Sequence, residues 1–404
     1  MFLRVVLFFA FSFAWSGPVS YYGKLQASGN KLIGSKTGST AVQVRGVSFG
    51  WSNTTWESGR FYQAAYAANA VEHMVKDWKA EVVRAAYGAT TSIFSNSTAT
   101  ENRTSVERIV NAAIENDVYA IIDWHSEKAP NELQNSKDFF EYMAQKYGDK
   151  DNVIFEIYNE PTGTPWASIK TYAETIIPII RQYSSNLILV GTPTYSQQIQ
   201  NVVGNAINDP NVGYVVHFYA YSHPLKNWLN NLNTALNSNL PIFVTEYGTT
   251  HSDGGLSTSN PSHYETHSAA NSDEWHTFMD EKKISSAAWN INDKTEGSAF
   301  FGIQGAAKKF DMQSWADKTK MTASGQYIFD KLNKYYESAP WKSAQTPIKP
   351  LAVEDLAING DASIEIFSLQ GKKMGNSLSN LNSGIYILLL KQGSQTKTMK
   401  IVKK

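Results

Sequence analysis

The sequence predicts an α/β protein, a (β/α)8 TIM barrel followed by a small all-β, sandwich-like C-terminal domain. Short apolar runs that are typical of buried parallel strands alternate with helical patterns over about 300 residues. Two of these runs, 153–161 (VIFEIYNEP) and 242–248 (IFVTEYG), contain or end near a carboxylate. The C-terminal ends of barrel strands are where such folds place their chemistry, so both runs point to a functional site.

Eight segments fit the strands of the barrel. The expected strands lie at 42–47, 81–85, 119–123, 153–157, 187–190, 212–218, 242–245 and 286–288. The expected helices lie at 61–78, 106–116, 138–147, 169–183, 274–281 and 323–336. Residues 17–40 are polar and rich in Gly and Ser, so we expect a lead-in there. The barrel domain is therefore expected to span 17–336.

The two ends of the chain differ from the barrel in composition and hydrophobic pattern. Residues 1–16 (MFLRVVLFFAFSFAWS) place Arg4 before an apolar stretch and small residues, which predicts a signal peptide cleaved after Ser16 or, alternatively, after Ala14. Residues 337–353 hold three prolines without periodicity, which predicts a linker. Beyond it, 354–404 is expected to be a β-rich domain with strands at 363–368, 384–391 and 396–402.

Composition excludes several classes of function. The chain has 36 basic and 36 acidic residues, so it lacks the basic excess expected of a protein that binds nucleic acid or anionic lipid. It has no cysteine, which excludes disulfides, thiolate catalysis and thiolate metal sites. An aromatic content of 13% fits both a large core and a site that stacks sugar rings.

Polar side chains gather at the ends of six of the eight expected strands. They are Arg84, the run Asp123-Trp124-His125, the pair Asn159-Glu160, the run His217-Phe218-Tyr219, Glu246 and Trp289. Each buried polar group needs a partner, so a set of this size favours an active site over core filling. Two carboxylates on separate strands are what glycoside hydrolysis requires.

This ordered set resembles glycoside hydrolase family five, a family of retaining endo-β-glycanases, and most closely its bacterial cellulase branch. Further matching stretches are RGVSFGWS (45–52), RAAYG (84–88), IIDWHS (121–126), HFYAYSH (217–223) and WNINDKTEGS (289–298). The resemblance covers 40–335. It implies an endo-1,4-β-glucanase that acts on a β-glucan polysaccharide and uses neither cofactor nor metal.

The resemblance also implies roles for the matching residues. Glu160 is expected to be the acid/base and Glu246 the nucleophile, about 5 Å apart. Burial and the charge of Glu246 are expected to raise the pKa of Glu160, while Arg84 and Tyr219 keep Glu246 ionised.

The remaining candidates are expected to bind substrate. Asn159 is expected to bond the sugar 2-hydroxyl, His125 and His217 to orient hydroxyls or the carboxyl pair, and Trp289 to stack under the sugar. Lys294 and Glu296 match residues that contact a neighbouring sugar. Structural roles fit equally well for Tyr87, Trp51 and His223. Three further aromatic residues are candidates for sugar subsites, but the sequence does not indicate which subsite each would form. They are Trp124, Trp166 and Tyr195.

The tail resembles the C-terminal sorting domain of the type IX secretion system, in the stretches IEIFSLQGKKM (364–374), LNSGIYILLLKQG (381–393) and TMKIVKK (398–404). This implies export via the periplasm to the cell surface or medium, with the tail contacting export machinery. The protein is separately expected to be a monomer. An unrelated β-sandwich or a carbohydrate-binding module is the alternative. From 351 onward, however, the only aromatics are Phe367 and Tyr386.

Three other functions remain open. The same retaining chemistry can serve mannan, xylan or mixed-linkage glucan, since loops set substrate choice on a barrel. A non-catalytic glycan-binding protein would not need both Glu160 and Glu246. A metal-dependent hydrolase using Asp123, His125 and His217 would be expected to show dense ligand spacing such as HExxH, which the sequence lacks.

Overall fold

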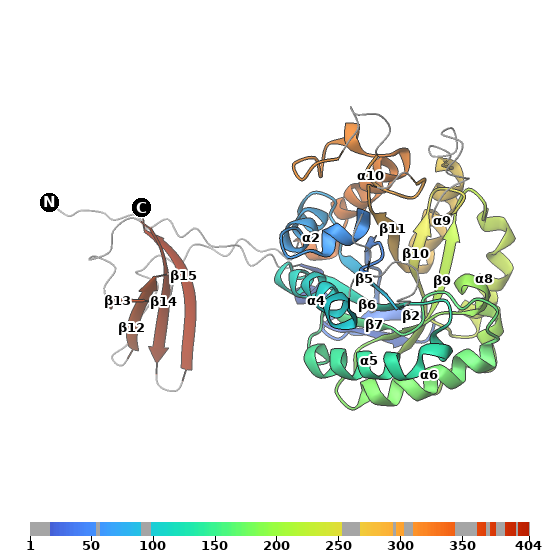
Figure 1. The fold of residues 1–404 in the computed structure, drawn as a ribbon, viewed down its shortest axis with the longest axis horizontal. Helices are drawn as coiled ribbons and strands as arrows, with labels where there is room; N and C mark the ends of the chain where they lie inside the picture. Colours follow the sequence, from blue (N-terminus) through green and yellow to red (C-terminus); the bar gives the residue numbers. More distant parts are fainter. Residues whose placement is uncertain are drawn as a thin grey trace. The chain divides into compact units, whose positions relative to one another are not determined.

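The computed structural model describes residues 17–53, 57–89, 98–252, 267–293, 296–302, 310–343, 362–368, 372–376, 384–392 and 395–403. The chain divides into two compact units (Figure 1). One is Gly17–Lys342, and the other includes Ser343–Lys404. Within the described residues, no helix has both the length and the apolar content needed to cross a membrane.

The unit 17–342 is built on a closed barrel of eight parallel strands that follow one another in sequence order. The strands are β4 (Arg45–Phe49), β5 (Val82–Gly88), β6 (Tyr119–His125), β7 (Val153–Glu156), β8 (Ile188–Val190), β9 (Val212–Tyr219), β10 (Ile242–Gly248) and β11 (Ser285–Ile291). All eight expected strands are present, which confirms the predicted (β/α)8 barrel. Several run further toward their C-terminal ends than predicted, because their polar end residues still pair with the neighbouring strand.

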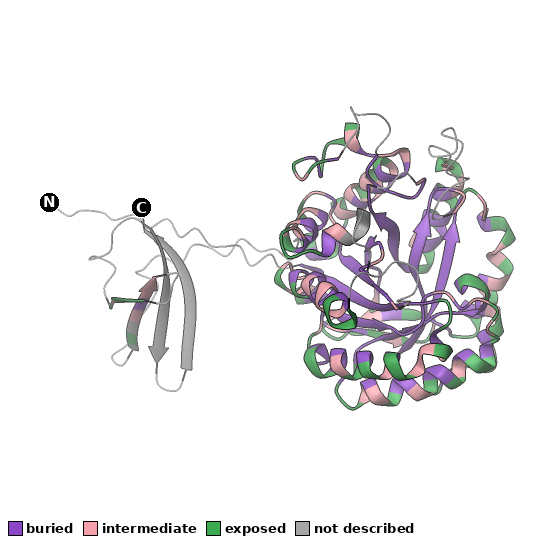
Figure 2. Ribbon diagram, viewed as in Figure 1, coloured by how far each residue is buried: buried purple, intermediate pink, exposed green. Residues whose placement is uncertain are grey.

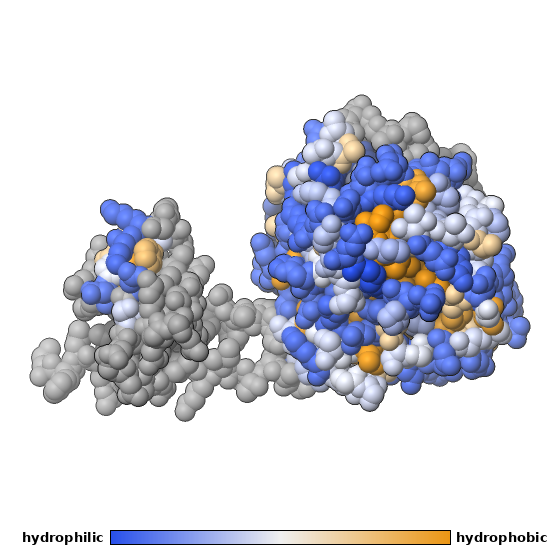
Figure 3. Space-filling model, turned by 90° about the horizontal axis from the view of Figure 1, so that it is seen from below, coloured by the Kyte–Doolittle hydropathy of each residue, from blue (hydrophilic) through white to orange (hydrophobic). Residues whose placement is uncertain are grey.

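Helices surround the barrel (Figure 1). The longer ones are α2 (Ala67–Lys76), α4 (Ala99–Glu115), α5 (Leu133–Tyr147), α6 (Trp166–Arg181), α8 (Leu229–Asn237), α9 (Ala269–Lys282) and α10 (Ala323–Glu337). The expected helix 61–78 is instead a short 3-10 helix, η1 (Glu57–Tyr62), followed by α2, and α8 had not been predicted. Buried residues line the barrel and the inner helix faces, while exposed residues lie outside (Figure 2). The face in Figure 3 is mostly hydrophilic, with narrow hydrophobic strips.

Shorter segments connect these elements. They are η2 (Ala129–Glu132), α7 (Pro193–Ser196), η3 (Ile199–Val202), η4 (Leu225–Asn227) and η7 (Lys318–Lys320).

Residues 17–42 form structure that the sequence analysis missed. They contain α1 (Pro18–Tyr22), β1 (Leu25–Ser28), β2 (Lys31–Gly34) and β3 (Ala41–Val42), with the three strands in one antiparallel sheet. Apolar side chains of this segment pack with the first residues of β5 and β6. We call residues 17–42 the N-terminal plug, because they cover the N-terminal end of the barrel.

Residues 337–343, which were expected to begin the linker, are structured. Helix α10 continues to Glu337, and α11 (Pro340–Ser343) follows it. The side chain of Trp341 is buried among the apolar residues of the N-terminal plug, and its indole N–H donates a hydrogen bond to Glu81. Residues 337–342 therefore pack with the barrel, because Trp341 anchors them there. The rest of the expected linker, and the expected signal peptide, lie outside the described residues.

The second unit contains an antiparallel sheet. Its strands are β12 (Ala362–Ser368), β13 (Lys373–Gly375), β14 (Gly384–Gln392) and β15 (Gln395–Lys403), in the order β13-β12-β14-β15. The three strands predicted for the tail correspond to β12, β14 and β15. The described strands make one sheet, and the sandwich-like domain stays a prediction.

Candidate active site

The polar residues predicted at strand ends converge at the C-terminal end of the barrel. Arg84 lies on β5, His217 and Tyr219 on β9, Glu246 on β10 and Trp289 on β11. Asn159 and Glu160 lie in the segment that follows β7. The main-chain N–H groups of Asn159 and Glu160 donate to the carbonyl oxygens of Trp124 and Ser126, at 3.3 and 3.2 Å. These bonds hold the segment after β7 against the end of β6.

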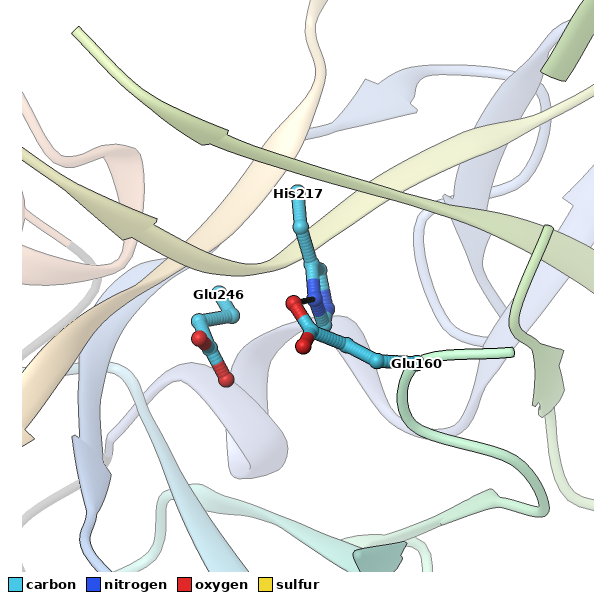
Figure 4. Close-up of side chains that lie close together, drawn as sticks. All are labelled: Glu160, His217 and Glu246. Carbon is cyan, nitrogen blue, oxygen red and sulfur yellow. Dashed lines mark hydrogen bonds and ion pairs between the residues drawn. The ribbon is translucent and has the colours of Figure 1, made fainter. Parts of the chain in front are cut away.

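Glu160 and Glu246 point toward one another with His217 beside them (Figure 4). One carboxylate oxygen from each glutamate and one ring nitrogen of His217 all lie within 4.8 Å of one another. His217 Nδ1 lies 2.9 Å from Glu160 Oε1. The Glu160 side chain is 19% exposed and that of Glu246 is 5% exposed, so only Glu160 opens appreciably to solvent.

Arg84 is fully buried and is the centre of a charge cluster. Its Nη1 donates to Glu246 Oε2 at 3.1 Å, and its Nε and Nη2 donate to the two carboxylate oxygens of Glu156 at 2.8 and 3.1 Å. Nη2 also lies 2.6 Å from Asn159 Oδ1 and 2.9 Å from Asp123 Oδ2. Burial alone would lower the pKa of Arg84, but the three carboxylates together raise it, so the guanidinium stays charged.

Burial has the largest effect on the pKa values of the groups around Arg84. It raises the pKa of Glu246, the charge of Glu160 raises it further, and His217 and Arg84 oppose the shift. It raises the pKa of Asp123 to about 7 against the pull of Arg84, and it lowers the pKa of His217 to about 4. His217 is therefore neutral at ordinary pH.

The contacts expected to keep Glu246 ionised are present. Arg84 makes one, and the Tyr219 hydroxyl donates to Glu246 Oε1 at 2.7 Å. The net direction of the Glu246 pKa is nevertheless upward, because burial and the charge of Glu160 together outweigh the nearby Arg84, His217 and His125.

An aromatic wall stands beside the carboxyl pair. Trp289 stacks on His125 with ring centroids 5.2 Å apart and an interplanar angle of 8°, and Trp51 meets the same imidazole edge-on at 4.8 Å. Trp289 and Tyr219 belong to one buried cluster, and Trp51 packs against it. The wall therefore joins the hydroxyl that contacts Glu246.

A comparison with known proteins places the chain in a family. The family described as Cellulase (glycosyl hydrolase family 5) matches residues 35–295. The chain belongs to glycosyl hydrolase family 5. It is 38% identical over 321 residues to Endoglucanase Z of Dickeya dadantii, which covers 79% of this chain and 67% of that protein.

Solved structures agree with membership in family 5. The catalytic domain of the Thermobifida fusca endoglucanase Cel5A superposes with a TM-score of 0.68 at 30% identity, covering 78% of this chain and 99% of that chain. A form of that domain in complex with cellotetraose gives a TM-score of 0.67 at 30% identity, covering the same shares. The chain is thus a glycoside hydrolase with the fold of endoglucanase catalytic domains.

Other residues singled out in this family 5 sequence lie around the site in different roles. His223 Nδ1 accepts a hydrogen bond from the main-chain N–H of Tyr219 at 3.0 Å and so supports the end of β9. Tyr87 is buried and stacks on Trp124 at 5.1 Å, which makes both part of the core. Glu296 Oε1 accepts from the side chains of Asn290 and Asn292, at 3.2 and 2.9 Å.

The remaining aromatic candidates separate by exposure. Trp166 is buried and donates its indole N–H to the carbonyl of Asn205, so it is a core residue. Tyr195 is 47% exposed, and its main-chain N–H donates to the carbonyl of Pro161, next to Glu160. Lys294 lies outside the described residues.

Sequence reasoning missed two buried residues of the site, Glu156 and Thr245. The Thr245 hydroxyl donates to Glu156 Oε1 at 2.7 Å and lies 2.9 Å from His217 Nε2. The signal for Glu156 was present, because a carboxylate inside an apolar strand needs a charged or hydrogen-bonded partner. Thr245 gave no such signal, since threonine is common in strands.

Glu160, His217 and Glu246 are close enough to hold a metal ion by distance alone. The charges around these residues disfavour a metal ion there. Arg84 lies 3.1 Å from Glu246 Oε2, and the Tyr219 hydroxyl binds the other oxygen. A second cation at this point would face the guanidinium at close range, so we assign no metal or cofactor to the site.

Proposed function

We propose that the protein is an endo-1,4-β-glucanase that hydrolyses internal bonds of cellulose and related β-glucans with retention of configuration. The Glu160–Glu246 pair carries the proposal. Carboxyl groups of retaining glycosidases lie about 5 Å apart, and those of inverting enzymes about 6.5–9.5 Å. Carboxylate oxygens of Glu160 and Glu246 lie within 4.8 Å of one another, which matches the retaining class. The endoglucanase relatives support the substrate class.

In this mechanism Glu246 attacks the anomeric carbon and Glu160 gives its proton to the departing glycosidic oxygen. The more exposed position of Glu160 suits it to meet both the leaving group and water. Formation of the glycosyl ester removes the charge of Glu246. Glu160, now a carboxylate, then takes a proton from a water molecule. The water oxygen attacks the anomeric carbon and breaks its bond to Glu246, which leaves as a carboxylate.

The neighbours of the pair are suited to hold the sugar. Arg84 binds Asn159 through Oδ1, which leaves the Asn159 amide N–H groups available to the sugar 2-hydroxyl. The flat face of Trp289, backed by His125, offers a stacking surface for the ring. Glu296, held by two asparagines, and Lys294 are proposed to contact a neighbouring sugar.

NMR of the first products from a panel of soluble β-glycans tests the reaction. We expect the β-anomer to appear first from a β-1,4-glucan. An α-anomer as first product would contradict the double displacement. Faster cleavage of mannan, xylan or mixed-linkage glucan than of β-1,4-glucan would instead replace the substrate while leaving the mechanism in place.

We also propose export through the periplasm to the cell surface or medium, as a monomer, with the tail as the sorting signal. One contact supports cleavage after Ser16. The Gly17 N–H donates to the carboxylate of Asp117, so cleavage there would create a charged amino group beside a carboxylate. N-terminal sequencing of secreted protein tests the cleavage point. Removing the tail in the native host is expected to trap the enzyme in the periplasm, and full export without it would contradict the sorting role.

A further inference from the structure

Both ring nitrogens of His217 are engaged. Nδ1 lies 2.9 Å from Glu160 Oε1, and Nε2 lies 2.9 Å from the Thr245 hydroxyl oxygen. A neutral imidazole carries one proton, so one nitrogen donates and the other accepts. The position of this proton decides whether Glu160 meets a donor or an acceptor.

The hydrogen bonds made by Glu156 and Thr245 decide which ring nitrogen of His217 donates. Both carboxylate oxygens of Glu156 accept from Arg84, and Oε1 also accepts from the Thr245 hydroxyl. A threonine hydroxyl has one hydrogen, and Thr245 gives it to Glu156. Its oxygen can then only accept, so the donor in its contact with His217 is the ring Nε2–H.

If Glu156 were protonated, it could donate to Thr245, and the donor and acceptor in each of these hydrogen bonds would be exchanged. It therefore matters which buried carboxyl holds a proton. Burial raises the pKa of Glu156, and it raises that of Asp123 to about 7. Glu156 meets Arg84 through both oxygens, whereas Asp123 meets it through Oδ2 alone. Asp123 Oδ1 has no hydrogen-bond partner among the described residues. The better place for a proton is therefore Asp123.

We propose that Thr245 and Glu156 are positioning residues that hold neutral His217 as the tautomer protonated on Nε2, so that Nδ1 accepts a hydrogen bond from the protonated carboxyl of Glu160. This inference rests on the proposed acid/base role of Glu160. Glu160 then reaches the Michaelis complex with the proton that the leaving oxygen requires.

The same tautomer serves the second step. After Glu160 has protonated the leaving oxygen, its carboxylate faces the lone pair of Nδ1, which cannot donate to it. Losing a hydrogen-bond donor at this one contact raises the basicity of a carboxylate, so Glu160 readily takes a proton from water. The charged or titratable groups that influence His217 are Glu246, Arg84, Glu156 and His125, and Glu160 adjoins both His217 and Glu246.

Nitrogen NMR of the full chain labelled with 15N-histidine reads the tautomer directly. The His217 signals are identified by their loss in His217→Gln. We expect a pyrrole-type shift for Nε2 and a pyridine-type shift for Nδ1 in the wild type and in Thr245→Ser. A protonated Nδ1 in the wild type overturns the inference without any variant that might misfold.

The pH profile provides a second readout. Thr245→Val removes the acceptor for Nε2–H, so His217 is free to donate from Nδ1 and stabilise the Glu160 carboxylate. The high-pH limb of kcat/KM is expected to move down by about 1–2 pH units. Thr245→Ser restores the wild-type limb. The matched control Thr192→Val removes another buried hydroxyl, bonded to the carbonyl of Val215, and leaves the limb unchanged.

A merely structural role for Thr245 predicts a different result, with lower activity at every pH and no displaced limb. That outcome overturns the inference. Substrates with a dinitrophenolate leaving group need no proton, so Thr245→Val is expected to spare their glycosylation step. The tautomer is read independently of turnover. A wild-type chain with Nε2 protonated but no glycanase activity would overturn the proposed function alone.

Discussion

The two ends of the barrel both bury charge, and they do so with different consequences. At the C-terminal end, Arg84 on β5 meets three carboxylates, next to the partly exposed Glu160. At the N-terminal end, Glu81, just before β5, accepts hydrogen bonds from the Arg45 main chain and from the Trp341 indole. The N-terminal plug covers that end. Only Val82 and Val83 lie between Glu81, which binds Trp341, and Arg84, which belongs to the candidate active site.

The largest effect is expected from the two glutamates proposed to be catalytic. Glu246→Ala removes the proposed nucleophile and is expected to lower kcat on the order of 10⁴-fold or more. Azide is expected to rescue it with an α-glycosyl azide. Glu160→Ala is expected to cost about 10²–10⁴-fold, to spare substrates with activated leaving groups, and to give the β-azide. The azide products are read by NMR.

The exposed Glu141→Ala is the control for these glutamates and is expected to leave activity unchanged. Swapped azide stereochemistry between the two variants would reverse the assigned roles.

At the opposite end, Trp341→Ala is expected to reduce stability and not turnover. Truncating this buried indole costs about 3–5 kcal/mol of unfolding free energy, measured by urea denaturation. Trp341→Phe keeps most of the apolar contact, loses only the bond to Glu81, and is expected to cost less. A fall in kcat of folded Trp341→Ala would show that the two ends are coupled.

The buried carboxyl of Glu81 is also expected to make stability depend on pH. Burial raises the pKa of Glu81 from 4.5 to about 7, so between these values the folded state holds a proton that the unfolded chain has released. Stability from Glu81 is therefore fully present below about pH 4.5 and is lost as pH rises toward 7, by at most about 3 kcal/mol.

Glu81→Gln tests this contribution. It is expected to flatten the pH dependence only in part, because burial also raises the pKa of Asp123 at the other end to about 7. The measurement is the unfolding free energy in urea across this pH window. An unchanged slope in Glu81→Gln would contradict the assignment.

Chelation is expected to have a smaller effect still. Exhaustive treatment with a chelator is predicted to leave kcat unchanged, because Arg84 already neutralises the carboxylate that a cation would bind. Activity lost on chelation and recovered with a divalent ion would contradict this reading of the site.

The smallest effect is expected from removing the tail. A chain ending at Ser343 is predicted to match the full chain in kcat/KM on soluble glucan. A chain ending at Ala339 also loses Trp341, and so provides a destabilised control. Loss of binding to insoluble cellulose on removal of the tail would indicate a carbohydrate-binding module.

The sequence predicted the end of the barrel that carries the candidate active site better than the opposite end. Polar residues that interrupt apolar strands, such as Arg84 and Glu246, stand out because burying them demands a function or a partner. Thr245 does not stand out, since its role depends on which groups it meets in space. The N-terminal plug was overlooked although Ser28 pairs with Lys31 across Gly29-Asn30, a recognisable two-residue hairpin turn. Its few apolar residues can be recognised as part of a core only once their contacts with the barrel are known.

The N-terminal plug and Trp341 bring both ends of the barrel unit to the same side of the domain. Val19 and Trp341 share an apolar cluster with Val82 and Tyr119, where β5 and β6 begin, and the carboxyl pair lies where the strands end. An attachment through either end of the unit 17–342, to a bead, a fibre or a fused protein, therefore leaves the carboxyl pair on the side away from the anchor. An immobilised form can be tethered at whichever end is convenient, because both orient the molecule in the same way.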